Sequence, residues 1–463
     1  MHEDFRDLYV GVDLAIPILG GETRRYVNLD NAASTPAFRW VQQAVDEFLP
    51  YYSSVHRGTG FKSQLSTYFY EKARHTVLAF MGANPDEHTC IFGKNTTEAL
   101  NKLARRFLFT PQRDVVLTTL MEHHSNDLPW RANAHVVHVG VLPDGRLDEA
   151  ELDALLAHYG SRVALVAVTG ASNVTGYLNP IHRLAEKAHA VGAQILVDCA
   201  QLAPHRAVNM GSLDDPAHLD YVSISAHKMY APFGSGALIG RRDTFAQGAP
   251  DMVGGGTIDM VTLDEVIWAQ PPDRDEAGSP NTVGAVALAA AMRQLQEVGM
   301  DVVAQHEAEL TAYALERLTN IPGIHIFGDT DPRNTMQRVG VIPFLVENAD
   351  HFLVSAILGH EFGIGVRSGC FCAHPYVLHL LEASDATTAR LRERIIQGDR
   401  TEMPGLIRAS FGLYNVPQDV DVLVDALQAV VRGAYQGKYQ QDRASGTYSP
   451  AGWAPVFEQY FDF

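Results

Sequence analysis

The chain is 463 residues long, is 46% hydrophobic and carries a formal net charge of −18 at neutral pH. This length suffices for two or three domains with a large core, and the acidity argues against nucleic-acid binding, which needs a basic surface. The sequence has no run of about 18 apolar residues, and its first residues lack a basic and an apolar signal-peptide region, so we expect no membrane association. With only four cysteines, the composition favours a reducing cytoplasm over a disulfide framework.

Between about residues 26 and 241, short β-rich runs alternate with helical stretches. The predicted strands cover residues 114–119, 162–169, 194–197 and 220–225. One predicted helix, over residues 180–191, opens with proline and carries apolar residues at helical spacing. Strands that alternate with amphipathic helices indicate an α/β fold with a mostly parallel sheet covered by helices on both faces. Ligands of such sheets bind at the carboxyl ends of the strands.

The pattern changes after Pro280. A long helical region is predicted over residues 282–320, followed by strands near 338–345, 363–368 and 406–411 and by a helix over 418–431. We interpret this part as a smaller α+β domain that the N-terminal segment joins.

The expected division follows from these patterns. The large domain covers residues 26–299, the small domain covers 1–25 and 300–434, and an aromatic C-terminal tail covers 435–463. The tail could dock on the body of the protein or on a partner subunit, or be partly disordered. Residues 382–404 are charged and helix-prone, and we interpret them as an insertion or a lid.

A lysine follows the strand predicted over residues 220–225, in the motif Ser225-Ala226-His227-Lys228. Lysine usually lies on a solvated surface, but this one follows the half-apolar run over residues 221–224. An amine held at a strand end beside a hydroxyl and an imidazole suits Schiff-base chemistry with pyridoxal phosphate (PLP). Asp198, directly after the apolar strand, would be the carboxylate that keeps the pyridine nitrogen protonated.

Other polar residues would complete such a site. Thr96 and Thr97 open a helical run and offer amides and hydroxyls to a phosphate group, which Ser225 and His227 could complete. His123 could stack on the cofactor ring.

Each of these residues also has a structural interpretation. A strand-end aspartate or a Thr-Thr-Glu helix start is often only a cap. The pair His123-His124 could be half of a metal site, but no His-Glu-x-x-His or Cys-x-x-Cys partner supports it, so we expect no metal. The occurrence of all these residues in one order on one αβ scaffold favours the PLP interpretation.

The chain resembles the class V aminotransferase superfamily of fold-type I PLP enzymes, and within it the Suf-type cysteine desulfurases and selenocysteine lyases. The resemblance spans about residues 29–431 and rests on several motifs in the expected order. These are Leu29-Asp30-Asn31-Ala32-Ala33-Ser34, Val55-His56-Arg57-Gly58, Asn95-Thr96-Thr97-Glu98, Met121-Glu122-His123-His124-Ser125-Asn126, Ser172-Asn173-Val174-Thr175-Gly176, Val197-Asp198-Cys199-Ala200-Gln201, Ser225-Ala226-His227-Lys228, Glu276-Ala277-Gly278-Ser279-Pro280-Asn281 and Arg408-Ala409-Ser410.

The resemblance implies roles for individual residues in cofactor binding. Lys228 would form the Schiff base, His123 would stack on the ring, Asp198 would pair with the pyridinium, and Gln201 would donate to the phenolic oxygen. The implied phosphate ligands are Thr96, Thr97, Ser225, His227 and Ser279. Ser279 would come from the neighbouring subunit, which implies a homodimer with sites at its interface.

The resemblance also implies a substrate site. Arg408 would clamp the substrate carboxylate, because its planar fork suits bidentate binding. Ala33, Asn173 and Arg367 would contact the substrate beside it.

Cys372 is the residue that distinguishes one reaction from another. It occupies the cysteine position of the family pattern Arg-x-Gly-x-x-Cys-Ala-x-Pro, in residues 367–375. As a thiolate it would attack the sulfur of PLP-bound cysteine and leave alanine and an enzyme persulfide, for transfer to a sulfur-acceptor protein. Cys370 stands where this loop commonly has histidine; it could resolve a persulfide, relay sulfur or only pack. Cys90 and Cys199 lie in or beside apolar strands and are expected to pack in the core.

The leading hypothesis is therefore a homodimeric PLP enzyme that removes sulfur from L-cysteine or an analogue. One alternative is another class V reaction on a different amino acid, such as selenocysteine lysis, C–S lysis, epimerisation or transamination. A second alternative is a catalytically silent sulfur-carrier or scaffold subunit, against which the complete set of lysine, aspartate, histidine and arginine argues.

Overall fold

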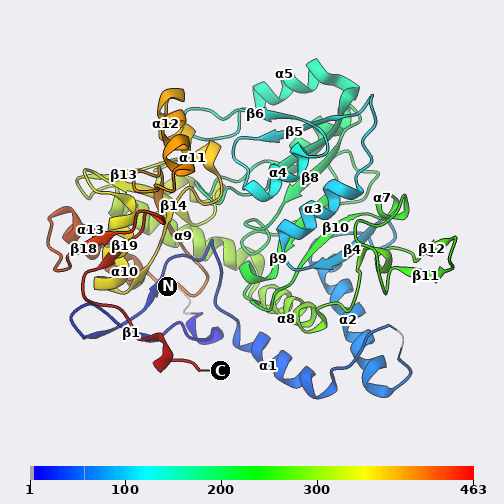
Figure 1. Ribbon diagram of the computed structural model, residues 1–463, viewed down its shortest axis with the longest axis horizontal. Coiled ribbons are helices and arrows are strands. Elements are labelled where there is room, and N and C mark those ends of the chain that lie inside the picture. The colour runs from blue at the N-terminus through cyan, green and yellow to red at the C-terminus, as the bar shows by residue number, and fades with distance from the viewer. Residues whose placement is uncertain (1–4, 57, 463) are drawn as a thin grey trace.

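A computed structural model describes residues 5–462 apart from residue 57, and its largest element is a seven-stranded sheet (Figure 1). The strand order is β4-β10-β9-β8-β7-β5-β6. Five neighbouring strands, β9 to β6, are parallel, whereas β10 runs antiparallel to both β9 and β4. The bounds are β4 (His88–Gly93), β5 (Val115–Thr119), β6 (His135–Val139), β7 (Val163–Thr169), β8 (Gln194–Asp198), β9 (Tyr221–Ser225) and β10 (Gly236–Arg241). The predicted α/β class with a mostly parallel sheet is confirmed.

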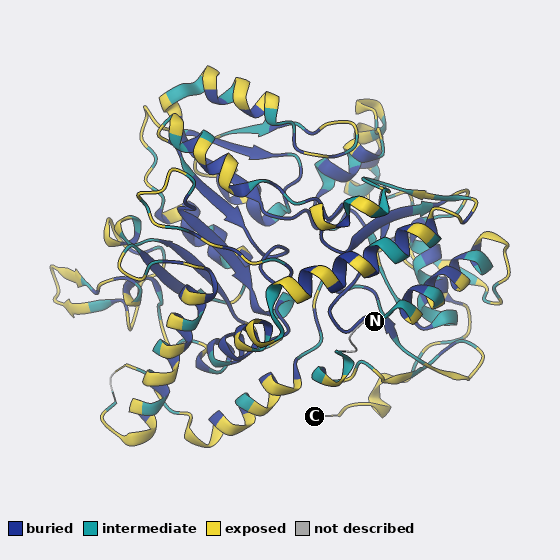
Figure 2. Cartoon of the chain, turned by 180° about the vertical axis from the view of Figure 1, so that it is seen from behind, coloured by how far each residue is buried: buried dark blue, intermediate teal, exposed yellow. Residues whose placement is uncertain are grey.

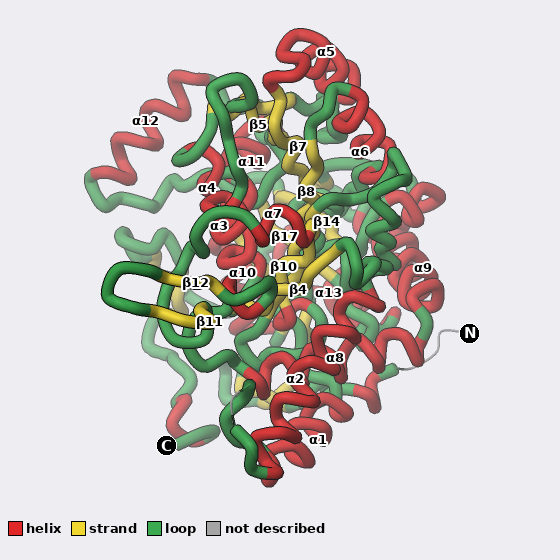
Figure 3. The backbone as a smooth tube through the Cα atoms, turned by 90° about the vertical axis from the view of Figure 1, so that its right-hand side faces the viewer, coloured by secondary structure: helices red, strands yellow, loops and turns green. Residues whose placement is uncertain are grey.

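Helices cover this sheet on both sides. Figure 3 shows the strands between α3 and α4 on one side and α6 on the other. All seven residues of β7 are buried, which explains its unbroken apolar run: a strand covered on both faces has no solvated side. The helices of this part are α1 (Arg39–Phe48), α2 (Phe61–Phe80), α3 (Thr96–Arg106), α4 (Leu128–Arg131), α5 (Glu149–Tyr159), α6 (Ile181–Ala190), α7 (Arg242–Ala246) and α8 (Thr282–Val298).

A second sheet of four antiparallel strands has the order β13-β14-β17-β16. Its apolar face packs in a separate core with residues of α9, α10 and α13, among them Leu310, Leu358 and Leu423. A short N-terminal strand, β3 (Val27–Asn28), pairs in parallel with β15 (Ile364–Gly365) beside this core. The remaining bounds are α9 (Met300–Leu318), β13 (Ile324–Ile326), β14 (Val341–Val346), α10 (His351–Phe362), β16 (Arg367–Gly369), β17 (Leu406–Ser410) and α13 (Pro417–Val431).

Two predicted elements are each divided in the structure. The helical region predicted over 282–320 is two helices, α8 and α9, because Gly299 between them takes a φ of 92° that helices do not contain. The strand predicted over 363–368 is also two strands, since β15 pairs with β3 while β16 pairs with β17.

Several short elements lie outside the two sheets. Residues 382–404 contain α12 (Asp385–Ile396), preceded by α11 (His374–Leu380), and the C-terminal tail forms a hairpin of β18 (Tyr439–Gln441) and β19 (Tyr448–Pro450). Two further hairpins are β1 (Ala15–Pro17) with β2 (Thr23–Arg25), and β11 (Ile258–Val261) with β12 (Val266–Trp268). Figure 2 shows both strand layers buried, whereas the last residues of the chain are exposed. Within the described residues, no helix has the length and apolar character required to cross a bilayer.

Candidate active site

A cavity of about 470 Å³ lies at the carboxyl ends of the parallel strands and contains nearly all the predicted site residues. Lys228, Asp198 and Thr169 reach it from the ends of β9, β8 and β7, as the parallel sheet requires. The predicted residues that line it are Ala33, Thr96, Thr97, His123, Asn173, Asp198, Gln201, Ser225, His227, Lys228, Arg367, Cys372 and Arg408. Residues from both sheets therefore meet in one cavity.

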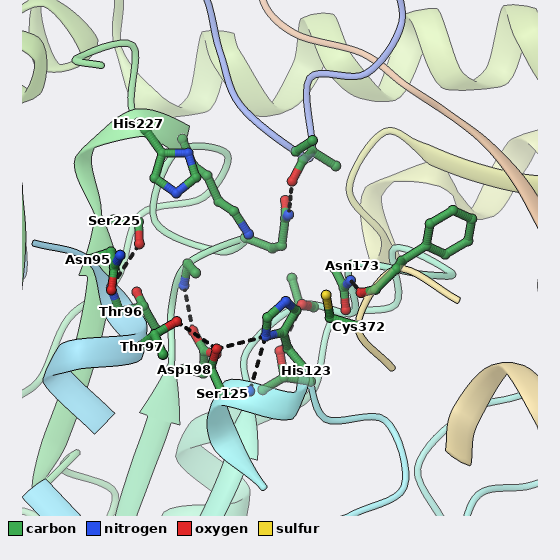
Figure 4. A pocket seen from close by; sticks show the side chains of 18 of the residues that line it. Asn95, Thr96, Thr97, His123, Ser125, Asn173, Asp198, Ser225, His227 and Cys372 are labelled. Atoms are coloured by element: carbon green, nitrogen blue, oxygen red, sulfur yellow. Dashed lines mark hydrogen bonds between the residues drawn. The ribbon is translucent and has the colours of Figure 1, made fainter. Parts of the chain in front are cut away.

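One wall of the cavity offers donors for an anion (Figure 4). Asn95 caps α3, and its side chain accepts from the Glu98 amide at 3.0 Å. The amide of Thr96, the next residue, donates to the Ser225 hydroxyl at 2.8 Å, and the Thr97 hydroxyl lies 2.7 Å from that of Ser125. The buried Thr96 hydroxyl has no hydrogen-bond partner among the described residues. A helix start, hydroxyls and an unpaired buried donor fit a phosphate group.

His123 lies between this wall and Cys372 (Figure 4). Its Nδ1 accepts from the Ser125 amide at 3.1 Å and lies 3.0 Å from the Ser125 hydroxyl. Burial, with the positive charge of Lys228 as the next contribution, lowers the pKa of His123 to about 3. A neutral, fixed imidazole is suited to stacking on an aromatic ring.

The preceding residue, Glu122, fixes this segment to the sheet. One carboxylate oxygen accepts from the Thr119 hydroxyl at 2.6 Å and from the Thr169 amide at 2.9 Å, and the other accepts from the Asn126 amide group at 2.6 Å. Glu122 thereby joins the ends of β5 and β7, and it holds the position of His123 without lining the cavity.

Two ionisable groups face each other electrostatically in the cavity, the buried Asp198 and the half-buried Lys228. Burial raises the pKa of Asp198, although its carboxylate accepts from the Ala200 amide at 2.9 Å. Burial lowers the pKa of Lys228 to about 8, against the attraction of Asp198. A cationic ligand atom beside Asp198 would stabilise the negative charge of its carboxylate, which burial disfavours. An amine with the pKa of Lys228 becomes nucleophilic near neutral pH.

Two arginines share one carboxylate at the other end of the cavity. Arg408 lies 3.1 Å from one oxygen of Asp30, and Arg367 lies 3.0 Å from the other. Arg408 also donates to the Asn173 carbonyl at 2.9 Å, and burial lowers its pKa to about 10. Its buried Nε has no hydrogen-bond partner among the described residues. Asp30 lies in a motif that carries the resemblance, but the sequence alone gave it no role.

The cysteine loop, residues 369–373, carries an exposed Cys372 into this cavity. Phe371 and Cys372 both have positive φ, 50° and 55°, which side chains seldom adopt and which the surroundings must hold. The Asn173 amide group donates to the Phe371 carbonyl at 2.8 Å, and the His124 amide donates to the Cys372 carbonyl at 2.7 Å. The loop is thus held on two sides of its thiol.

Cys370 does not line the cavity that contains Cys372. It is buried, and its thiol lies 3.0 Å from the Pro404 carbonyl oxygen. Burial, with a smaller contribution from Cys372, raises the pKa of the Cys370 thiol to about 12. Of the three interpretations of Cys370, the structure favours packing. Cys90 and Cys199 are buried as expected.

Ser279 is the predicted site residue that does not line this cavity. It lies on a separate pocket of about 260 Å³ with Glu98 and Asn281. This placement leaves the contribution of Ser279 from a neighbouring subunit as a prediction. Conversely, Ser125 and Phe371 line the main cavity without having been assigned a role. The position of Ser125 two residues after His123 was the available signal.

Comparisons with known proteins match most of the chain. Residues 27–423 match the family model of the class V aminotransferases. A cysteine desulfurase of Haloferax volcanii is 35% identical over 437 residues, covering 91% of this chain and 93% of the relative. A cysteine desulfurase of Dickeya dadantii is 35% identical over 414 residues, covering 87% and 92%. The apo structure of a cysteine desulfurase from Thermococcus onnurineus aligns with a TM-score of 0.76 at 31% identity, covering 88% of this chain and 95% of that one.

Proposed function

The chain belongs to the class V aminotransferase family, and from this premise we propose that it is a PLP-dependent cysteine desulfurase. The observation that carries the proposal is the presence of Cys372 in the same cavity as Lys228, Asp198 and Arg408. A lysine, a buried carboxylate and an arginine suit many PLP enzymes. The thiol beside them is what favours desulfuration over the other class V reactions and over a silent carrier subunit.

The residues of the cavity fit PLP. Lys228 Nζ would attach the cofactor, Asp198 would face its ring nitrogen, and His123 would lie against its ring. The Thr96 hydroxyl, which has no hydrogen-bond partner in the described part of the chain, would bind the phosphate together with Thr97, Ser225 and His227. Gln201 donates to the Ala32 carbonyl oxygen and has a second N–H for the phenolic oxygen. When bound, PLP would supply an electron sink for bond breaking in the amino-acid substrate.

In this proposal Arg408 binds the substrate carboxylate. Its guanidinium is buried, and its Nε is unpaired among the described residues, so a carboxylate can gain a charge-assisted bond there. Asn173, whose carbonyl already accepts from Arg408, would contact the substrate on the same side. Ala33 and Arg367 line the rest of this end of the cavity.

The sulfur transfer would use the Cys372 thiolate. Its Sγ would attack the sulfur of the bound cysteine, so that a Cys372 Sγ–S bond forms while the Cβ–S bond of the substrate breaks. The amine of Lys228, whose pKa is lowered to about 8, would return a proton to complete alanine. The persulfide on Cys372 would then be open to an acceptor protein, because this thiol is exposed.

The proposal extends to assembly and location. We propose a homodimer in which Ser279 of one chain completes the phosphate site of the other. We also keep the cytoplasm as the location, because all four cysteines are free thiols.

The central experiment compares Cys372→Ala with Cys370→Ala, which removes a thiol two residues away. Alanine and sulfide are measured from L-cysteine with a reductant. We expect Cys372→Ala to lose both products while keeping the visible absorbance of bound cofactor, and Cys370→Ala to keep most of the activity. Parent-like turnover by Cys372→Ala would exclude the persulfide step.

A substrate panel tests the choice of amino acid. We expect L-cysteine to change the cofactor absorbance and to release alanine, and the same measurement is made with selenocysteine, cystathionine and alanine. A strong response to another amino acid without turnover of cysteine would favour a different class V reaction. Absence of any cofactor absorbance would favour the silent subunit.

A further inference from the structure

A second cluster of chemistry-bearing side chains lies at the opposite end of the large sheet. His189 is near the end of α6, His218 lies in the turn before β9, and Asp220 directly precedes β9. Among the described residues, these three place one ligand atom each within 4.8 Å of the others. Lys228 follows the far end of β9, so the cluster lies roughly 17 Å, one strand length, from the cavity. It belongs to no part of the proposed desulfurase site.

The two imidazoles are held by their Nδ1 atoms. His189 Nδ1 lies 2.7 Å from the Pro216 carbonyl oxygen, and His218 Nδ1 lies at hydrogen-bond distance from the Asp215 carbonyl oxygen. A carbonyl can only accept, so each Nδ1 carries the proton. The arrangement leaves Nε2 as the inward-facing atom of both rings, and it is the arrangement found in histidines that bind metals.

The Nε2 atoms face an acceptor as well. His189 Nε2 lies 2.9 Å from one Asp220 oxygen, and His218 Nε2 lies 3.3 Å from the other. A neutral imidazole has one N–H, so both rings would need a second proton to satisfy both ends. Two cationic rings would then stack at 4.1 Å, beside a carboxylate that already pairs with Arg241 at 3.1 Å. Protonation of both rings would therefore place two stacked cations side by side in this cluster.

A metal ion resolves the conflict. Placed between the two Nε2 atoms and Asp220, it accepts the lone pairs of two neutral rings whose Nδ1–H groups stay with the carbonyls. Two ligand atoms bound to one zinc ion at about 2.1 Å lie about 3.0 to 3.4 Å apart, for bond angles between about 90° and 109°. The spacing of 3.3 Å between His218 Nε2 and one Asp220 oxygen lies in this range, and the spacing of 2.9 Å between His189 Nε2 and the other oxygen lies just below it.

We propose that His189, His218 and Asp220 bind one divalent transition-metal ion of the zinc class. Two imidazoles and a carboxylate are ligands that zinc prefers, and three protein ligands leave a position for water. The ion would clip the end of α6 to the start of β9. His88, on β4, carries a buried Nε2 without a hydrogen-bond partner among the described residues and lies in electrostatic range of His218 and Asp220. Arg241 is the cationic neighbour that limits the affinity.

The test titrates Zn²⁺ alone into the chelator-treated full-length protein. It uses a Cys372→Ala background, since the exposed thiol would also bind zinc. We expect one ion per chain, and His189→Ala or His218→Ala should each weaken binding at least about 100-fold, because loss of an outer partner alone costs about 10- to 100-fold. The matched control is His182→Ala on the same helix, whose Nδ1 also lies 2.8 Å from a carbonyl oxygen, that of Ala217. It should leave binding unchanged.

Two further measurements do not depend on removing a ligand. Arg241→Gln removes the competing cation and should tighten zinc binding, and Co²⁺ bound to the unmutated cluster should give visible bands without a sulfur charge-transfer band. Absence of zinc binding would overturn the proposal. So would equal affinities of His189→Ala, His218→Ala and the parent, or an unchanged affinity in Arg241→Gln.

Discussion

Lys228 and Arg408 bring two cations into one enclosed space, and burial lowers the pKa of both by a similar amount. The pKa of Lys228 falls to about 8, whereas that of Arg408 falls only to about 10, so at neutral pH the guanidinium stays charged. The pKa of Lys228 lies close enough to neutral pH for its amine to release and take up a proton. Chemistry at Lys228 and carboxylate binding at Arg408 are therefore separated by the intrinsic pKa values of the two side chains, in one low-dielectric environment.

The first prediction concerns the Lys228 amine in protein freed of cofactor. Below its pKa the amine is protonated and unreactive, and above it the neutral amine attacks electrophiles. We expect labelling of Lys228 by an amine reagent to reach half its maximal rate near pH 8, against about 10.4 for an ordinary lysine. Peptide mass spectrometry measures the labelling, with the exposed Lys62 in the same digest as a control. A midpoint near 10 would contradict the burial argument.

The second prediction separates the two arginines that share Asp30. Arg408→Lys keeps the charge but loses the fork, and a bond to a charged group is worth about 1.5 to 3 kcal/mol. We expect the KM for L-cysteine to rise about 10- to 100-fold in steady-state assays. Arg367→Lys is the matched control and should change KM less, because the Arg367 side chain is 51% exposed and that of Arg408 only 3%. The reverse order would assign the carboxylate to Arg367.

At the scale of elements, the cysteine loop depends on the close approach of two paired backbone segments, at glycines that carry no side chain. Gly369 ends β16 with a φ of 112°, and Gly405 directly precedes β17. A Cβ on Gly405 would lie 2.5 Å from the Gly369 Cα, closer than atoms can approach. The close approach of these segments also brings the Pro404 carbonyl to the Cys370 thiol. Glycine at 405 therefore fixes the distance between the loop and the strand that carries Arg408.

The third prediction follows from this close approach of Gly405 to Gly369. Gly405→Ala must displace the cysteine loop, so it should lower kcat for sulfur release and destabilise the protein by about 1 to 3 kcal/mol. The readouts are alanine formation and the midpoint of thermal unfolding. Gly359→Ala in α10 is the control, because its Cβ would come no nearer than 3.9 Å to another heavy atom. It should leave activity intact and stabilise the helix by up to about 1 kcal/mol. Equal behaviour of the two variants would count against a role for this close approach.

The elements that the sequence predicted well are those with a local signal. The run over 163–168 is apolar throughout, and the polar residues at strand ends, such as Asp198 and Lys228, meet because parallel strands share one edge. Pairing between distant segments carries no such signal. Nothing local indicates that Asp30 bridges Arg367 and Arg408, or that residues 363–368 divide between two pairing partners. The domain boundaries remain a prediction.

At the scale of the whole molecule, the C-terminal tail is joined to the active-site region through residues 399–405. The β18–β19 hairpin packs on α10, where the Tyr439 hydroxyl donates to Glu361 at 2.9 Å. Arg400 donates two hydrogen bonds to the turn of this hairpin. Its backbone amide donates to the Arg443 carbonyl, and its guanidinium donates to the Ala444 carbonyl. The Gln441 amide group donates to the Thr401 carbonyl. Of the roles considered for the tail, docking on the body therefore describes the β18–β19 hairpin, residues 439–450.

The last prediction tests whether the hairpin stabilises the segment behind the cysteine loop. Deleting residues 435–463 removes three hydrogen bonds to Arg400 and Thr401, each worth about 1 kcal/mol, and so favours local opening around Pro404. Because the Cys370 thiol lies against the Pro404 carbonyl, we expect its alkylation to become at least about tenfold faster, measured by mass spectrometry. Deleting only residues 455–463 leaves the hairpin intact and should not change the rate. If all three proteins are alkylated at one rate, the hairpin does not hold this segment, and Cys370 is protected by its own loop alone.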